Sequence, residues 1–353
     1  MAPRGRGARP GHGVRPPAGA PRPLPGTSPA GLRRRRLGRR AALAALLGAS
    51  ACGLPPGSLT RPESLPEGFP DPLAGLPLRP LGVVAVDTER LGADGLSGLH
   101  VAPDLTLTAI SDRGRWCQAR LLLSPEGAPL GLEAPRSGPL RDIAGRPFQG
   151  FLGDAECLAA LPDGSWLVGF ERLHRIQRYR HLDGPAEPAP SPPGLAQWPG
   201  NGALESLGVL PDGRWLAIAE SERPPGDEGA RVAWIGGPRA WRRFAYRPAP
   251  GHDPSDLCPL PDGGALVLER HAAFPEGFSA RLTRLPPLPD RPGTLEGELV
   301  ARLAPPLPSD NWEGVSAFRH RGRDLVAVVS DDNQLFFQRT LLMVLAWTDQ
   351  PAA

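Results

Sequence analysis

The chain has 353 residues, enough for one large domain or two of ordinary size, and a formal net charge of +3. The charge is unevenly distributed. Residues 1–51 contain 11 arginines and no acid, and the remainder contains 29 arginines and 37 acidic residues. An acidic body argues against nucleic acid as a partner. The sequence has no Cys-x-x-Cys pair, phosphate-binding loop or dinucleotide fingerprint, so nothing in it indicates a structural zinc site or an organic cofactor.

The N-terminal segment, residues 1–52, has the features of an export signal. Its apolar run, Ala41–Ala51, is too short to span a bilayer. The pair Arg39-Arg40 before this run resembles a twin-arginine signal, and Ala49–Cys52 resembles a lipobox that would make Cys52 a lipidated N-terminus. An ordinary signal-peptidase site after Ala51 is the alternative. We expect an exported bacterial protein that is periplasmic, or held at the membrane only by a lipid on Cys52.

Residues 53–80 are rich in Pro and Gly and lack apolar periodicity, which predicts an extended linker. Three cysteines remain after the linker, Cys117, Cys157 and Cys258. An odd number in an exported protein leaves at least one thiol unpaired or bridged to another chain. Since two of them lie beside apolar positions of predicted strands, we expect buried cysteines that pack as small apolar residues.

A hairpin unit recurs along the rest of the chain. It consists of a short strand, a Pro-Asp-Gly turn and an apolar strand, with acidic residues before the first strand and charged residues after the second. Three copies are close and two are looser; they occupy residues 153–172, 201–221, 253–270, 95–114 and 311–332. Five copies of one supersecondary unit predict a repeat architecture.

The spacing of the repeat indicates an all-β fold, a β-propeller. One apolar residue of the first strand recurs at steps of 59, 49, 50 and 58 residues, as Leu99, Leu158, Leu207, Leu257 and Val315. These steps suit four-stranded blades. The direct count predicts five blades over residues 81–349, and six remain possible if a degenerate blade occupies the longer gaps. The last blade lacks a strand, which Leu81–Val86 can supply, so we expect the N-terminal strand to close the ring.

In such a ring the Pro-Asp-Gly turns lie on one face, and the flanks of the hairpins converge on the other, around a central channel. Acidic and arginine side chains from every blade recur there at one register. The residues that we predict for catalysis are Asp112, Arg113, Glu156, Glu171, Arg172, Glu205, Glu269, Arg270 and Glu313. Those that we predict as metal ligands are Glu156, Glu205, Glu220, Asp256, Glu313 and Asp331.

Crowded carboxylates need a cation, arginine pairing or raised pKa values. Their oxygens suit Ca²⁺ or another divalent cation, and the arginines suit a phosphate or carboxylate. Together they indicate hydrolysis of an ester with help from a metal ion. The alternative is structural, because pairs such as Glu171-Arg172 and Glu269-Arg270 can also join neighbouring blades through ion pairs.

The ordered set of motifs resembles the bacterial phytase-like domain family, which is described as having esterase-like activity of phytase. The resemblance covers residues 80–347 and rests on LSGLHVAPD, DAECLAALPDGSWLVGFER, NGALESLGVLPDGRWLAIAES, DPSDLCPLPDGGALVLER and NWEGVSAF. It implies a β-propeller, usually exported, that hydrolyses a phosphate or carboxylic ester. We therefore expect a monomer that acts on a small ester substrate; the alternative is a non-catalytic propeller that binds a ligand or a protein at the cell envelope.

Overall fold

The computed structural model describes residues 58–65, 73–198, 200, 202, 204–273, 277–333 and 338–348. The chain divides into two units, residues 1–52 and 53–353, and only the second contains described residues. The predicted export signal and Cys52 therefore lie outside the described residues. Within them, no helix combines the length and the apolarity that crossing a membrane requires.

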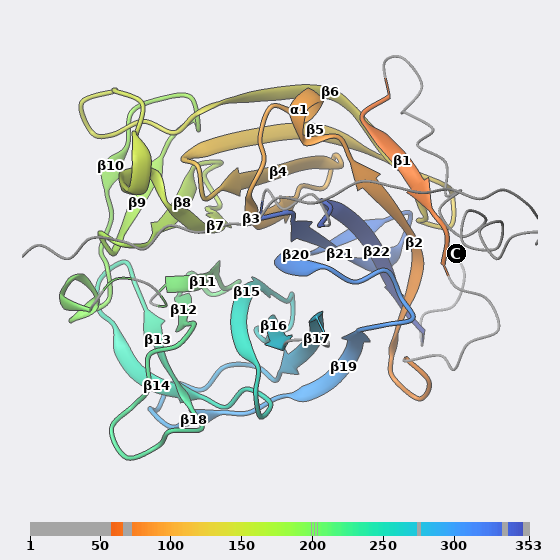
Figure 1. Cartoon of the computed structure of the whole chain (residues 1–353). Coiled ribbons are helices and arrows are strands. Elements are labelled where there is room, and N and C mark those ends of the chain that lie inside the picture. The colour runs from red at the N-terminus through yellow and green to blue at the C-terminus, as the bar shows by residue number, and fades with distance from the viewer. Residues whose placement is uncertain are drawn as a thin grey trace, which may run out of the picture. The chain divides into compact units, whose positions relative to one another are not determined.

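The described residues form five blades of mainly antiparallel strands (Figure 1), as the direct repeat count predicts. Blade 1 contains β3 (Leu96–Val101), β4 (Thr106–Ser111), β5 (Arg115–Leu123) and β6 (Pro129–Pro139). Blade 2 contains β7 (Ala155–Ala160), β8 (Trp166–Phe170), β9 (Arg175–Tyr179) and β10 (Glu187–Pro188). Blade 3 contains β11 (Leu204–Val209), β12 (Trp215–Ala219), β13 (Arg231–Gly236), β14 (Arg242–Tyr246) and the parallel β18 (Thr294–Leu295).

Blade 4 contains β15 (Asp253–Pro259), β16 (Ala265–Ala273), β17 (Gly277–Leu285) and β19 (Glu298–Leu303). Blade 5 contains β20 (Asn311–His320), β21 (Arg323–Asp331), β22 (Leu341–Trp347), β2 (Leu78–Val86) and β1 (Thr60–Glu63). Short helical turns connect the strands: α1 (Thr88–Leu91), η1 (Gly150–Gly153) and η2 (Leu195–Gln197). The inner strands β3, β7, β11, β15 and β20 surround the centre of the ring (Figure 1).

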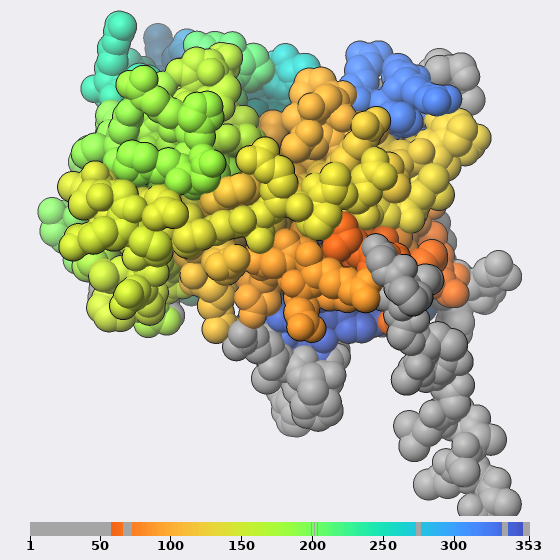
Figure 2. Space-filling model, turned by 90° about the horizontal axis from the view of Figure 1, so that it is seen from above, coloured from red at the N-terminus to blue at the C-terminus, as the bar shows by residue number. Residues whose placement is uncertain are grey.

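The N-terminal strand closes the ring, as we predicted. Strand β2 pairs antiparallel with β22, from Leu78 opposite Trp347 to Ala85 opposite Leu341. This pairing satisfies the edge that the last blade would otherwise expose. Strand β1 lies within residues 53–80, the segment that we expected to be a linker, and adds a fifth strand through its pairing with β2. Figure 2 looks onto the outer edge of the molecule, where β6 and the loop after it (yellow) lie beside earlier segments of the chain (orange).

The Pro-Asp-Gly segments form the tight turns that the sequence predicts. Their glycines, Gly164, Gly213 and Gly263, have φ values of 81°, 85° and 85°, which favour glycine because it has no Cβ. In each turn the preceding Asp accepts a hydrogen bond from the backbone N–H two residues on, at 2.9–3.0 Å. These aspartates therefore hold hairpin corners, on the opposite side of each hairpin from the charged flanks.

The core residues of the repeat pack between blades. Leu99, Leu158, Leu207, Leu257 and Val315 are all buried, with exposed fractions of 3% or less. The inner strands approach one another so closely that a Cβ on Gly98 would lie 2.6 Å from the backbone nitrogen of Leu158. The three cysteines of the body are buried and unpaired, which confirms that they pack as core residues.

Candidate functional site

Each inner strand carries an irregularity at the same place, and this irregularity creates the first ring of the site. Two residues before the core residue, the pairing between the first and second strands of the hairpin changes register. One residue of the inner strand is therefore left without a partner in the second strand, and in blade 1 two residues are. A bulge of this kind redirects a side chain. The residues at this position are Ser97, Glu156, Glu205, Ser255 and Glu313, and all except Ser255 line one cavity.

A second ring comes from the other strand of each hairpin. In each hairpin, one residue of the second strand lies opposite the residue just before the bulge, and the residue that follows it is charged in every blade. The five residues are Asp112, Glu171, Glu220, Arg270 and Asp331, and all of them line the same cavity. Four blades thus contribute a carboxylate, whereas blade 4 contributes a guanidinium.

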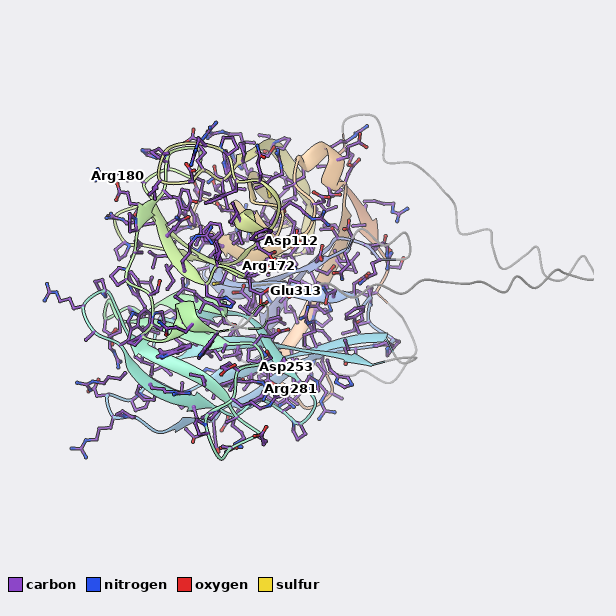
Figure 3. All side chains as sticks on the ribbon, turned by 60° about the vertical axis from the view of Figure 1, so that its left-hand side comes forward. Asp112, Arg172, Arg180, Asp253, Arg281 and Glu313 are labelled. Carbon is purple, nitrogen blue, oxygen red and sulfur yellow. The ribbon has the colours of Figure 1, made fainter. Side chains whose placement is uncertain are left out.

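The two rings enclose a cavity of about 280 Å³. Eight carboxylates and two arginines line it, together with Ser97 and Asn333. In Figure 3 the labelled side chains of Asp112, Arg172 and Glu313, which come from blades 1, 2 and 5, gather near the middle of the molecule, whereas Arg180 lies at its periphery. The carboxylates greatly outnumber the arginines, so the cavity favours a cation.

Burial and mutual repulsion raise the pKa values of these carboxyl groups. Burial is the main cause for Asp112, whose pKa rises to about 6, and for Glu313 and Asp331, whose pKa values rise to about 7. The pKa values of Glu156 and Glu205 lie well above the usual range, first because they are buried and second because neighbouring carboxylates repel their negative charge. Without a cation, these groups compete for the few positive charges in the cavity.

Arg270 provides one of these positive charges and joins three blades. Its Nη2 donates to Glu220 Oε1 at 2.7 Å, and its Nη1 donates to Asn311 Oδ1 at 3.0 Å and to Glu313. Asn311 Nδ2 in turn donates to Glu313 Oε1 at 2.7 Å. Because its donors are engaged and its side chain is only 22% exposed, Arg270 neutralises carboxylates from blades 3 and 5.

Arg172 is placed differently. Its backbone has a φ of 59°, an uncommon conformation for a residue with a Cβ. Its Nε donates to Asp154 Oδ2 at 2.5 Å, and its side chain is 47% exposed while it lines the cavity. The turn therefore presents a guanidinium that is anchored at one edge and reaches solvent, a suitable arrangement for binding an anionic group.

Three carboxylates are close enough to share one cation. Ligand oxygens of Asp154, Glu156 and Glu171 lie within 4.8 Å of one another. Hydrogen bonds hold two of them in place: Ser97 Oγ donates to Glu156 Oε2 at 3.1 Å, and the backbone N–H of Gly202 donates to Glu171. Across the cavity, Asp331 Oδ1 is buried and has no hydrogen-bond partner among the described residues.

Of the residues predicted from sequence, nine line this cavity: Asp112, Glu156, Glu171, Arg172, Glu205, Glu220, Arg270, Glu313 and Asp331. Arg113 lies beside it, 43% exposed and bonded to Asp112 at 3.1 Å, but does not line it.

Two other predicted residues face elsewhere. Glu269 points away from the channel, where it accepts from Tyr246 and from the backbone N–H of Ala249 (3.0 Å) and pairs with Arg281 at 3.4 Å. Its neighbour Arg270 faces the cavity, because successive residues of a strand point to opposite sides. Asp256 is buried between inner strands and accepts from the backbone N–H of Val315 at 2.8 Å.

The predicted set omits Ser97, Asp154 and Asn333, which also line the cavity. The repeat itself could have revealed Ser97, because it stands two residues before Leu99, just as Glu156 stands two residues before Leu158. Asp154 could have been found in the same way, because only Ala155 separates it from Glu156, and both therefore lie on the charged face of the ring. Asn333 directly follows the last hairpin copy, residues 311–332, so the repeat also places it on the charged face.

Comparisons with known proteins bear mainly on the family. The search of curated proteins found no match. Similar solved structures include a luciferin-regenerating enzyme, 12% identical over 73% of this chain and 92% of the other, with a TM-score of 0.41. A PQQ-bound aldose sugar dehydrogenase of Streptomyces coelicolor is 14% identical over 76% and 98%, with a TM-score of 0.40. A protein provisionally assigned as a gluconolactonase is 14% identical over 78% and 93%, with a TM-score of 0.41.

Structural similarity at such low sequence identity and TM-score says nothing about the activity of this chain. The model of the phytase-like family, described as "esterase-like activity of phytase", matches residues 92–334, which is more than half of the chain. The match spans both rings of the cavity. The chain therefore belongs to the phytase-like family.

Proposed function

We propose that this protein hydrolyses a phosphate or carboxylic ester in the cavity formed by the two rings, with a divalent cation bound among the carboxylates. The observation that carries the proposal is the position of Asp154, which belongs to the carboxylate triad and also anchors Arg172. A cation site and an anion-binding guanidinium thus share one residue. This pairing suits a substrate that carries negative charge next to the bond that is broken.

The donor set fits a hard cation such as Ca²⁺. Two oxygens on opposite sides of a calcium ion with bonds of about 2.4 Å are about 4.8 Å apart, and the triad oxygens fall within that distance. All the donors are oxygens, and Asp331, whose buried Oδ1 has no hydrogen-bond partner among the described residues, lines the same cavity. Zinc, which favours nitrogen and sulfur ligands, fits this set less well.

A bound divalent cation would supply Lewis acidity and would neutralise charge that develops on the ester oxygens. The side chains perform the remaining tasks. Arg172 holds the anionic group of the substrate through its exposed guanidinium edge. Asp331, whose pKa of about 7 lies near neutral pH, lines the cavity and accepts a proton from the attacking water. Arg270 maintains the positions of Glu220 and Glu313.

We also propose that the protein works outside the cytoplasm, exported through the twin-arginine-like signal and anchored by a lipid at Cys52. This proposal rests on the sequence of residues 38–52 alone.

The test is an assay of the full-length chain on p-nitrophenyl phosphate and p-nitrophenyl acetate, with Ca²⁺ and after chelation with EDTA. We expect turnover that requires the cation and that Glu171→Gln abolishes. The matched control is Asp163→Asn, a carboxylate in a hairpin corner, which should keep full activity. Absence of turnover with every divalent cation, together with a melting temperature independent of Ca²⁺, would refute the proposal in favour of a non-catalytic ligand-binding propeller.

A further inference from the structure

Three large apolar side chains are exposed beside the acidic cavity. Phe151 and Leu152 lie on η1 and are 61% and 38% exposed, and Leu173 lies in the loop after β8 and is 53% exposed. We call these three residues the apolar rim. Single exposed apolar residues are ordinary on protein surfaces, but these come from two loops that both lead directly into the cavity.

The apolar rim is held in place by Arg175. Its Nη1 donates to the carbonyl oxygen of Leu173 at 2.8 Å, and its Nη2 donates to that of Leu152 at 2.6 Å. The same guanidinium lies 4.1 Å from the ring centroid of Phe170 and 5.2 Å from that of Phe148. One arginine therefore joins both loops and rests on a layer of aromatic rings, so the rim is a preorganised surface.

The chain is continuous between the apolar rim and the site. Asp154 follows Leu152 by two residues and belongs to the carboxylate triad, and Arg172 immediately precedes Leu173 and lines the cavity. Asp154 and Arg172 are themselves bonded at 2.5 Å. The anion-binding guanidinium and the apolar rim are thus adjacent on the same pair of loops.

This arrangement suits a molecule with an anionic or ester head and an apolar remainder. The cavity lining is almost wholly polar, so an apolar group would find no favourable contact inside it. Outside it, the rim offers three apolar side chains next to Arg172. From this geometry we infer that the substrates are amphiphilic esters, whose head enters the cavity and whose apolar chain rests on Phe151, Leu152 and Leu173. The inference rests on the proposed function of the site.

The experiment compares p-nitrophenyl acetate, butyrate and octanoate, each below its micellar concentration, with the full-length chain. We expect kcat/KM to rise about two- to fourfold per added methylene, as burial of a methylene on an apolar surface allows. In the double variant Phe151→Ser, Leu173→Ser the dependence on chain length should disappear, while the value for acetate stays within about twofold. Both side chains are exposed, so these changes should leave the fold intact.

The matched control is Leu130→Ser, on the outermost strand of blade 1 and 60% exposed, which should keep the dependence on chain length. A second measurement, calorimetric binding of octylphosphonate and methylphosphonate, needs no turnover. The octyl compound should bind at least tenfold more tightly, and the double variant should remove this preference.

If the protein hydrolyses the esters but neither kcat/KM nor phosphonate binding favours the longer chain, the inference is overturned and the proposed hydrolysis stays intact. Absence of turnover with a preference for octylphosphonate would refute the hydrolysis and support the amphiphile site. If the double variant instead weakens binding to phosphatidylcholine vesicles and leaves the phosphonate preference unchanged, the apolar rim contacts a membrane, and the inference is wrong.

Discussion

Replacement of Arg270 by methionine tests the electrostatic design of the cavity most directly. Methionine keeps a long side chain on β16 but removes the charge that contacts Glu220, Asn311 and Glu313. In four blades the equivalent position is acidic, so the change removes the single positive charge of the second ring. Glu313 is then left buried with Asn311 as its remaining bonded partner.

Breaking a buried ion pair by removing one partner costs about 3–5 kcal/mol. The loss should depend on pH. Glu313 and Asp331 have folded-state pKa values of about 7, above their values of about 4 in an unfolded chain. The native state therefore holds more protons between these limits, and the free energy of unfolding falls as pH rises from about 4 to about 7. Without Arg270 the pKa of Glu313 rises further and the fall continues to higher pH, so we expect most of the loss at pH 8 and much less at pH 5.5.

The assay is urea denaturation of the full-length variant at pH 5.5 and pH 8, with and without Ca²⁺. At pH 8, Ca²⁺ at about 100 times its dissociation constant should restore about 2.7 kcal/mol through preferential binding to the native state. The control is Arg281→Met, which removes the partner of the buried Glu269 outside the cavity and should be unaffected by Ca²⁺. A loss that is equal at both pH values and unaltered by Ca²⁺ would refute the role assigned to Arg270.

Three further predictions concern single side chains. Glu156→Gln should weaken Ca²⁺ binding, measured by calorimetry, at least tenfold, whereas Asp163→Asn in the hairpin corner should leave it unchanged; equal effects would contradict the assignment of faces. Asp331→Asn should raise the cation-free melting temperature at pH 8 but not at pH 5, because it removes a buried carboxylate that ionises at about pH 7; a lower melting temperature at pH 8 would count against this reasoning. Arg172→Lys should raise KM for p-nitrophenyl phosphate about tenfold with little change in unfolding free energy, since lysine cannot make the bidentate contact; an unchanged KM would exclude Arg172 from substrate binding.

Much of the cavity could be predicted from the repeat. The spacing of Leu99, Leu158, Leu207, Leu257 and Val315 placed equivalent strands around a ring, and the acidic flanks then had to meet on one face. The Pro-Asp-Gly turns identified the other face, because their backbone geometry is local and needs no tertiary contact. The closing strand followed from the same argument, since a ring with an open edge would leave backbone groups unpaired.

The side of the strand on which each residue points was harder to predict. Glu269 and Arg270 are neighbours and both suit a site, but they lie on opposite sides of β16, so that Arg270 points toward the cavity and Glu269 toward Tyr246. A one-residue shift reverses the faces of a strand, and no propensity of the sequence marks where the shift occurs. The same limit applies to Asp256, which a bulge at Ser255 places between the inner strands instead of at the mouth.

The sequence by itself therefore determined the all-β repeat, a ring of five or six blades, the closure of the ring and the face on which charge gathers, because these follow from local periodicity and turn chemistry. The tertiary structure decided that the number of blades is five. Only the tertiary structure decided which carboxylates lie close enough to share a cation, which arginine is engaged and which is exposed, and that an apolar rim lies beside the cavity. These properties depend on distances between blades, and such distances arise from packing of residues that lie far apart in the chain.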